Sequence, residues 1–127
     1  MELRQLSVEE TKDLEIVYPN GEPTGMVITL RSIDSPECKR VIKKWDKVAT
    51  RAGRKGLSFE QKEQAAIELL SAATVGWTGY TDGGDEVQCD EEQKVLLYSD
   101  QRTGFVREQV DEYLGDKSSF LSRTVKA

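Results

Sequence analysis

Apolar residues in the middle of the chain recur at the spacing of one face of a helix. Ser58 is a favourable N-cap, and Gln61, three residues later, completes the sequence pattern of a capping box. The apolar positions that follow are Ala65, Ala66, Leu69, Leu70, Ala73 and Trp77. This spacing predicts a core helix that extends to Trp77. We expect Leu69 to be buried at the centre of the contact with a neighbouring helix.

A second apolar stripe precedes this helix and predicts its antiparallel neighbour. Ser35 is a favourable N-cap, and Pro36 suits the first helical position because its missing N–H costs nothing there. The stripe consists of Cys38, Val41, Ile42, Trp45, Val48, Ala49 and Ala52. The connector between the two helices is short, so we expect a helical hairpin over residues 35–77. Trp45 and Trp77 should then both point into its shared core.

Alternation of apolar and other residues near the N-terminus predicts two strands. The apolar positions of the first strand are Leu14, Ile16 and Tyr18, and those of the second are Met26, Ile28 and Leu30. This period of two is the period of a β-strand. The stretch PNGEPTG between them is dense in turn residues. The sequence therefore predicts a β-hairpin over residues 12–32.

The last third of the chain is less regular. Residues 78–89 are rich in Gly and Asp and are predicted to form an exposed acidic loop. A helix–loop–helix calcium site that began at Asp82 would need a closing Glu at its twelfth position, where this chain has Gln93. Residues 90–121 are predicted to form the C-terminal helices, because Asp90 is a good N-cap and apolar residues recur after it.

Length and composition are those of one polar, globular domain. The chain has 127 residues, of which 37% are hydrophobic and 32% are charged. We predict a single α+β domain over residues 1–127, with an N-terminal β-hairpin and a mostly helical body of four or more helices. No apolar run approaches the length of a membrane span, and the N-terminus lacks the apolar core of a signal peptide. The expected location is cytoplasmic.

Charge is distributed unevenly along the chain. The net charge is −5, but residues 35–57 carry eight basic and two acidic residues, a net charge of +6. Residues 1–34 carry −4 and residues 58–127 carry −7. A basic segment between acidic ones suits a phosphate backbone, a solvated helix face or a contact with an acidic partner. The candidate partner-binding residues on this segment are Lys39, Arg40, Lys43, Lys44 and Lys47.

The sequence lacks the residues of the common catalytic mechanisms. It contains no His, which excludes a Ser–His or Cys–His nucleophile. Its two cysteines, Cys38 and Cys89, lie far apart, and a zinc site built on them would need further ligands from carboxylates alone, which is uncommon. No Gly-rich junction between a strand and a helix offers a nucleotide site. We therefore predict a non-enzymatic protein without a cofactor or a metal.

Five segments, taken in order, form a recognisable set. They are the turn PNGEPTG, the strand GMVITLRSIDSPE that leads into a basic helix, the segment LLSAATVGWTGY, the helix EEQKVLLYSD and the ending GFVREQVDEYLGDKSSFL. Together they resemble the small tail assembly chaperones of long-tailed phages and prophages. The resemblance spans nearly the whole chain, and none of the segments is a catalytic signature. The family is diverse, so no binding site is carried over residue by residue.

The resemblance implies a function in the host bacterial cytoplasm and absence from the mature virion. Such chaperones bind the long tape-measure protein, keep it soluble and help to recruit the tail-tube protein. A helix-in-groove contact would shield the apolar stripes of a tape-measure helix. Besides the basic face, large aromatics near the chain end are candidates for partner binding. They are Phe105, Tyr113 and Phe120.

Self-association and other functions stay open at this stage. The basic segment could pair with the acidic half of a second copy to form a homo-oligomer. Other phage structural proteins, such as a head–tail connector, are one alternative. A small acidic regulator is another, although the +6 segment interrupts its acidic surface. A nucleic-acid-associated adaptor that uses the basic helix is the third.

Overall fold

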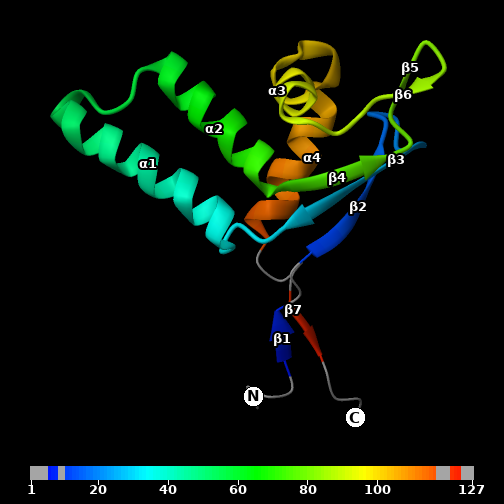
Figure 1. Cartoon of the computed structure of the whole chain (residues 1–127), viewed down its shortest axis with the longest axis horizontal. Coiled ribbons are helices and arrows are strands. Elements are labelled where there is room, and N and C mark those ends of the chain that lie inside the picture. The colour runs from blue at the N-terminus through cyan, green and yellow to red at the C-terminus, as the bar shows by residue number, and fades with distance from the viewer. Residues whose placement is uncertain (1–5, 9–10, 117–120, 124–127) are drawn as a thin grey trace.

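Helices and antiparallel strands make up most of the chain in a computed structural model, which describes residues 6–8, 11–116 and 121–123. The strands are β1 (Leu6–Val8), β2 (Thr11–Val17), β3 (Pro23–Arg31), β4 (Thr74–Thr78), β5 (Thr81–Asp82), β6 (Asp85–Glu86) and β7 (Leu121–Arg123). The helices are α1 (Pro36–Ala52), α2 (Phe59–Ala73), α3 (Glu91–Ser99) and α4 (Gly104–Gly115), with 3₁₀ turns η2 (Gly53–Lys55) and η3 (Gln101–Thr103). With an N-terminal hairpin and four α-helices among the described residues, the predicted α+β class is confirmed (Figure 1).

The helix starts follow the capping signals of the sequence. The side chain of Ser35 accepts a hydrogen bond from the backbone N–H of Cys38 at the start of α1. At the start of α2, Ser58 and Gln61 form a complete capping box, with hydrogen bonds of 3.1 and 2.9 Å. At the start of α3, the side chain of Asp90 accepts a hydrogen bond from the backbone N–H of Gln93. Each cap satisfies backbone donors that the first turn of a helix leaves without partners.

The central sheet has three antiparallel strands in the order β2–β3–β4. The predicted hairpin over residues 12–32 is confirmed as β2 and β3. In the register of the sheet, Leu14 is opposite Ile28, and Ile28 is opposite Trp77. Side chains of paired residues point to the same face of a sheet, so these three residues share the face that the helices cover.

The third strand is a correction to the predicted helical hairpin over residues 35–77. Helix α2 ends at Ala73, and Thr74 has an extended backbone with φ −85° and ψ 116°. Strand β4 follows, and Thr74 pairs with Leu30 of β3. The backbone groups at the edge of β3 need partners, and the β-branched residues of this segment suit a strand. Trp77 fits the helical spacing only by coincidence.

Two further strand pairs lie outside the central sheet. Strands β5 and β6 form a small exposed hairpin within the predicted acidic loop over residues 78–89. Strands β1 and β7 pair near the two ends of the chain, apart from the central sheet (Figure 1). The predicted C-terminal helices over residues 90–121 are present as α3 and α4, but Leu121 belongs to β7.

The buried core lies between one face of the sheet and α3, α4 and the end of α2. The buried apolar residues are Ile16, Met26, Ile28, Leu30, Cys38, Leu70, Ala73, Trp77, Leu97, Tyr98, Val106, Val110 and Leu114. Helix α4 is also held to the sheet by Gln109, whose side-chain amide accepts from Val17 N and donates to Val17 O. On α1, the one buried residue within the core is Cys38. Helices α1 and α2 with η2, here called the arm, therefore project from the sheet (Figure 1).

A polar pair is buried within this core. Thr74 Oγ1 donates to the carbonyl of Leu70 at 2.8 Å and lies 2.6 Å from the hydroxyl of Tyr98. Because the Thr74 proton is already used, the Tyr98 hydroxyl is the donor of the shorter bond. Burial raises the pKa of Tyr98 to about 12.

The raised pKa of Tyr98 predicts that this residue makes the protein less stable at alkaline pH. An unfolded Tyr ionises near pH 10, whereas Tyr98 in the folded protein stays neutral until about pH 12. The contribution of Tyr98 to the free energy of unfolding is therefore intact below pH 10 and falls as the pH rises from 10 towards 12. Urea unfolding of wild type and Tyr98→Phe across this range should show a steeper fall for wild type. Parallel profiles would contradict the buried position of the phenol.

Candidate partner-binding site

The arm leaves much of its surface open. Helix α1 makes its main contacts with α2, and its apolar stripe is only half-buried. The half-buried members of the stripe are Val41, Ile42, Trp45, Val48, Ala49 and Ala52. A pair of helices can cover only the facing side of each, so the flanks of the stripe stay accessible unless a further element packs on them.

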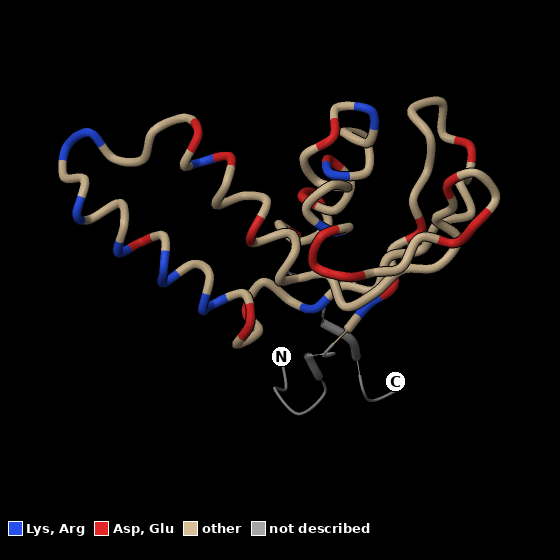
Figure 2. Tube along the Cα trace, turned by 45° about the horizontal axis from the view of Figure 1, so that its top comes forward, with Lys and Arg blue, Asp and Glu red and all other residues tan. Residues whose placement is uncertain are grey.

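The predicted basic residues lie together on the exposed side of α1. Lys39, Arg40, Lys43, Lys44 and Lys47 are all exposed. Lys44 Nζ forms an ion pair with Glu68 Oε1 of α2 at 2.9 Å. The other four have no ion pair among the described residues. Figure 2 shows Lys and Arg concentrated along α1 and around its end, while Asp and Glu dominate the sheet and the N-terminal side of α3.

Glu68 organises the contact between the two helices of the arm. It accepts hydrogen bonds from Lys44 Nζ and from the indole N–H of Trp45. Partial burial raises the pKa of Glu68, but these hydrogen bonds outweigh burial and hold its pKa below the usual value. Trp45 is therefore half-buried beside polar groups and does not share a core with Trp77, which corrects the prediction made for the two tryptophans.

A groove of about 540 Å³ opens where α1, α2 and α3 meet the end of β3. Its lining residues are Arg31, Glu37, Arg40, Val41, Lys44, Glu68, Ser71, Ala72, Glu91, Lys94 and Val95. Arg31 donates to the carbonyl of Ala72, which ties the end of β3 to α2. This space, here called the upper groove, combines apolar walls with a charged rim. It is therefore suited to binding a side chain or a helix of another protein.

A second groove, of about 220 Å³, lies on the other flank of α1 and is mostly apolar. Its lining residues are Val41, Ile42, Trp45, Asp46, Ala65, Ala66 and Leu69. The prediction that Leu69 is buried at the centre of the hairpin is therefore wrong, because Leu69 is half-buried at the edge of this groove. Leu70, one position later, points into the core. Phe59, at the start of α2, is 86% exposed.

The C-terminal aromatics are not part of the same surface as the basic residues. Phe105 is half-buried on α4, with its ring centroid 6.0 Å from that of Tyr18. Tyr113, also on α4, is half-buried against the core. Phe120 lies outside the described residues. The structure thus brings Phe105 and Tyr113 to the core side of the protein, whereas the basic residues follow the arm.

Sequence reasoning missed most of the upper groove. Arg31, Ser71, Lys94 and Val95 come from distant parts of the chain, and nothing local marks them as neighbours. Arg51 could have been found, because it continues the helical spacing of the basic residues that precede it on α1.

The described part of the chain shows neither an activated cysteine nor an assembled group of metal ligands. Burial raises the pKa of the Cys38 and Cys89 thiols, which makes both poorer nucleophiles. No group of three or more metal-ligating side chains comes together in the part of the chain that the structure describes.

Among the described helices, none has both the length and the apolar character required to cross a membrane. Comparisons of the chain with protein-family models, curated proteins and solved structures find no match.

Proposed function

We propose that this protein is a non-enzymatic tail assembly chaperone of a long-tailed phage or prophage. In this proposal it binds the tape-measure protein in the host bacterial cytoplasm, assists tail-tube assembly and leaves before the virion is complete. The sequence resemblance suggests the family. The observation that carries the proposal is the arm, a pair of helices with a basic exposed side and a groove on each flank of α1.

The arm suits a long helical partner for a physical reason. A tape-measure chain is largely helical, and its apolar stripes favour self-association before the tail-tube protein surrounds it. A helix that packs into a groove between two others buries such a stripe. The half-buried apolar residues of α1 gain burial in the same contact, so both partners benefit.

Two further contacts belong to the proposal. The C-terminal segment, at Phe105, Tyr113 and Phe120, would be a second contact for the tape-measure protein. A second copy of the chain could place its acidic body against the basic side of the arm. Self-association through exposed charges would weaken with salt, because charges are screened within about 10 Å at 0.1 M salt.

Co-expression with a phage tape-measure protein tests the function. Wild type should keep the tape-measure protein in the soluble fraction. Lys43→Glu/Lys47→Glu should lower that soluble fraction, and so should Phe120→Ala. Lys62→Glu is the control for a charge change elsewhere on the arm and should behave as wild type.

The outcomes separate the function from its surfaces. If wild type leaves the tape-measure protein insoluble, the chaperone function is wrong. If every variant keeps it as soluble as wild type does, the function stands and the assigned surfaces are wrong.

A further inference from the structure

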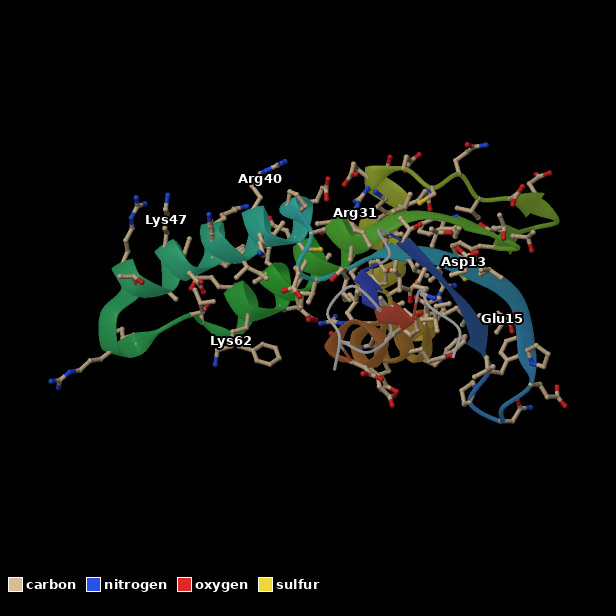
Figure 3. All side chains as sticks on the ribbon, turned by 90° about the horizontal axis from the view of Figure 1, so that it is seen from below. Asp13, Glu15, Arg31, Arg40, Lys47 and Lys62 are labelled. Carbon is tan, nitrogen blue, oxygen red and sulfur yellow. The ribbon has the colours of Figure 1, made fainter. Side chains whose placement is uncertain are left out.

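Four cationic residues form a row along one side of α1. Arg40, Lys44, Lys47 and Arg51 are separated by four, three and four residues, which places their side chains on one helical face. All four are exposed. Figure 3 shows Arg40 and Lys47 along one edge of the arm, in line with Arg31, and Lys62 on the opposite edge. These four residues are called the cationic row below.

The cationic row starts at the upper groove, where every acidic residue already has a cation. Arg31 Nε is 3.6 Å from Glu37 Oε2, Lys44 Nζ is 2.9 Å from Glu68 Oε1, and Lys94 Nζ is 3.1 Å from Glu91 Oε1. Arg40 lines the same groove and has no ion pair among the described residues. Lys47 and Arg51, further along the row, also have none there. The groove and the row therefore have an excess of positive charge.

The walls of the upper groove add a polar and an apolar component. Ser71 is 6% exposed, and its Oγ has no hydrogen-bond partner among the described residues. This oxygen has an accessible area below 1 Å², so Ser71 forms a polar part of the wall that a ligand does not reach directly. Val41 and Val95 supply apolar surface on either side. A ligand of this groove should therefore carry an acidic group for Arg40 and an apolar flank for the two valines.

We propose that the upper groove and the cationic row bind an acidic amphipathic helix of a partner protein. Its carboxylates would lie at positions i, i+4, i+7 and i+11, with one of them entering the groove beside Arg40. This inference rests on the proposed function in assigning that helix to the tape-measure protein. The row from Arg40 to Arg51 spans about 16 Å, which is about three turns of a partner helix.

A protein helix fits this site better than nucleic acid does. Nucleic acid would present a charged phosphate backbone to this groove. The apolar side chains of Val41 and Val95 have no counterpart on such a backbone. The helical spacing of the row matches acidic residues one turn apart on a second helix, and a carboxylate accepts paired hydrogen bonds from an arginine.

A designed peptide tests the site directly. The probe is a labelled helical peptide with Glu at i, i+4, i+7 and i+11 and an adjacent Leu stripe; its control carries Gln in place of Glu. Fluorescence anisotropy should show binding of the Glu peptide to wild type, weakened as salt rises from about 0.1 M to about 1 M. The Gln peptide should bind more weakly at the lower salt.

Charge reversal identifies the surface. Arg40→Glu/Lys47→Glu should weaken binding of the Glu peptide about tenfold or more, because two favourable contacts become repulsive. Lys62→Glu, the same kind of change on the opposite edge of the arm, should alter the affinity by less than about twofold. A peptide with Lys in place of Glu should bind the double variant better than it binds wild type. Urea unfolding of each variant confirms that it is folded.

Several results would overturn the inference. These are equal binding by wild type and the double variant, an equal loss in Lys62→Glu, or tighter binding of a DNA duplex than of the Glu peptide. Co-expression separates this inference from the proposed function. If Arg40→Glu/Lys47→Glu still keeps the tape-measure protein soluble, the site is wrong and the function stands. If wild type binds the peptide but not the tape-measure protein, the function is wrong and the site stands.

Discussion

Replacing Gly79 by alanine should destabilise the protein by about 2–4 kcal/mol, the sum of backbone strain and a steric clash. Gly79 follows β4 and has a φ of +73°, which an L-residue rarely adopts. A Cβ atom there would overlap the carbonyl oxygen of Gly25 and lie 2.9 Å from its carbonyl carbon. Both obstacles are backbone atoms, so no side-chain rotation relieves the clash. Strands β3 and β4 would have to separate.

Gly83→Ala is the matched control for this substitution. Gly83 also has a positive φ, +61°, but no atom lies within 4 Å of a Cβ placed on it. It should therefore cost only the backbone strain, about 1 kcal/mol. Urea unfolding of both variants measures the difference. Equal losses of stability would mean that Gly25 and Gly79 do not approach each other this closely.

The parts of the fold that depend on neighbouring residues could be predicted from the sequence. The capping box at Ser58 and Gln61 joins groups three residues apart, and the hairpin of β2 and β3 joins strands through a short turn. In both cases the interacting groups are close in sequence. Local preference and final structure therefore agree.

Strand β4 could not be predicted in this way, because its partner is distant in sequence. Residues 74–78 directly follow the helix, their first glycine comes only at Gly76, and Trp77 still continues the helical spacing. What ends the helix is the pairing of Thr74 with Leu30, more than forty residues earlier. Tertiary pairing decides the structure of such a segment against its apparent period.

The same distinction applies to the candidate site. The basic residues of α1 could be predicted, because charge and helical spacing are local properties of the sequence. The pairing of Glu68 with Lys44 and Trp45 depends on how α2 packs against α1. The upper groove further requires α3 to bring Lys94 and Val95 against the base of the arm. No spacing within one helix contains that information.

Leu70→Ala should destabilise the protein by about 2–5 kcal/mol, which is the range for deleting a buried leucine side chain. Leu70 is 2% exposed and belongs to the core beneath the sheet. The substitution removes apolar burial and leaves a cavity that the surrounding sheet and helices cannot fill without moving. The loss should appear as a lower urea midpoint with an unchanged slope, since the amount of surface exposed on unfolding stays similar.

Leu69→Ala is the control at the adjacent position of the same helix. Leu69 is half-buried at the edge of the apolar groove on the arm, so its shortened side chain leaves a space that water can enter. Only part of the transfer free energy is lost there, and we expect about 1–2 kcal/mol. A larger loss of stability for Leu69→Ala than for Leu70→Ala would mean that Leu69, and not Leu70, lies on the buried face of α2. The arm would then bury the side that this structure leaves open, and a partner helix could not bind along it.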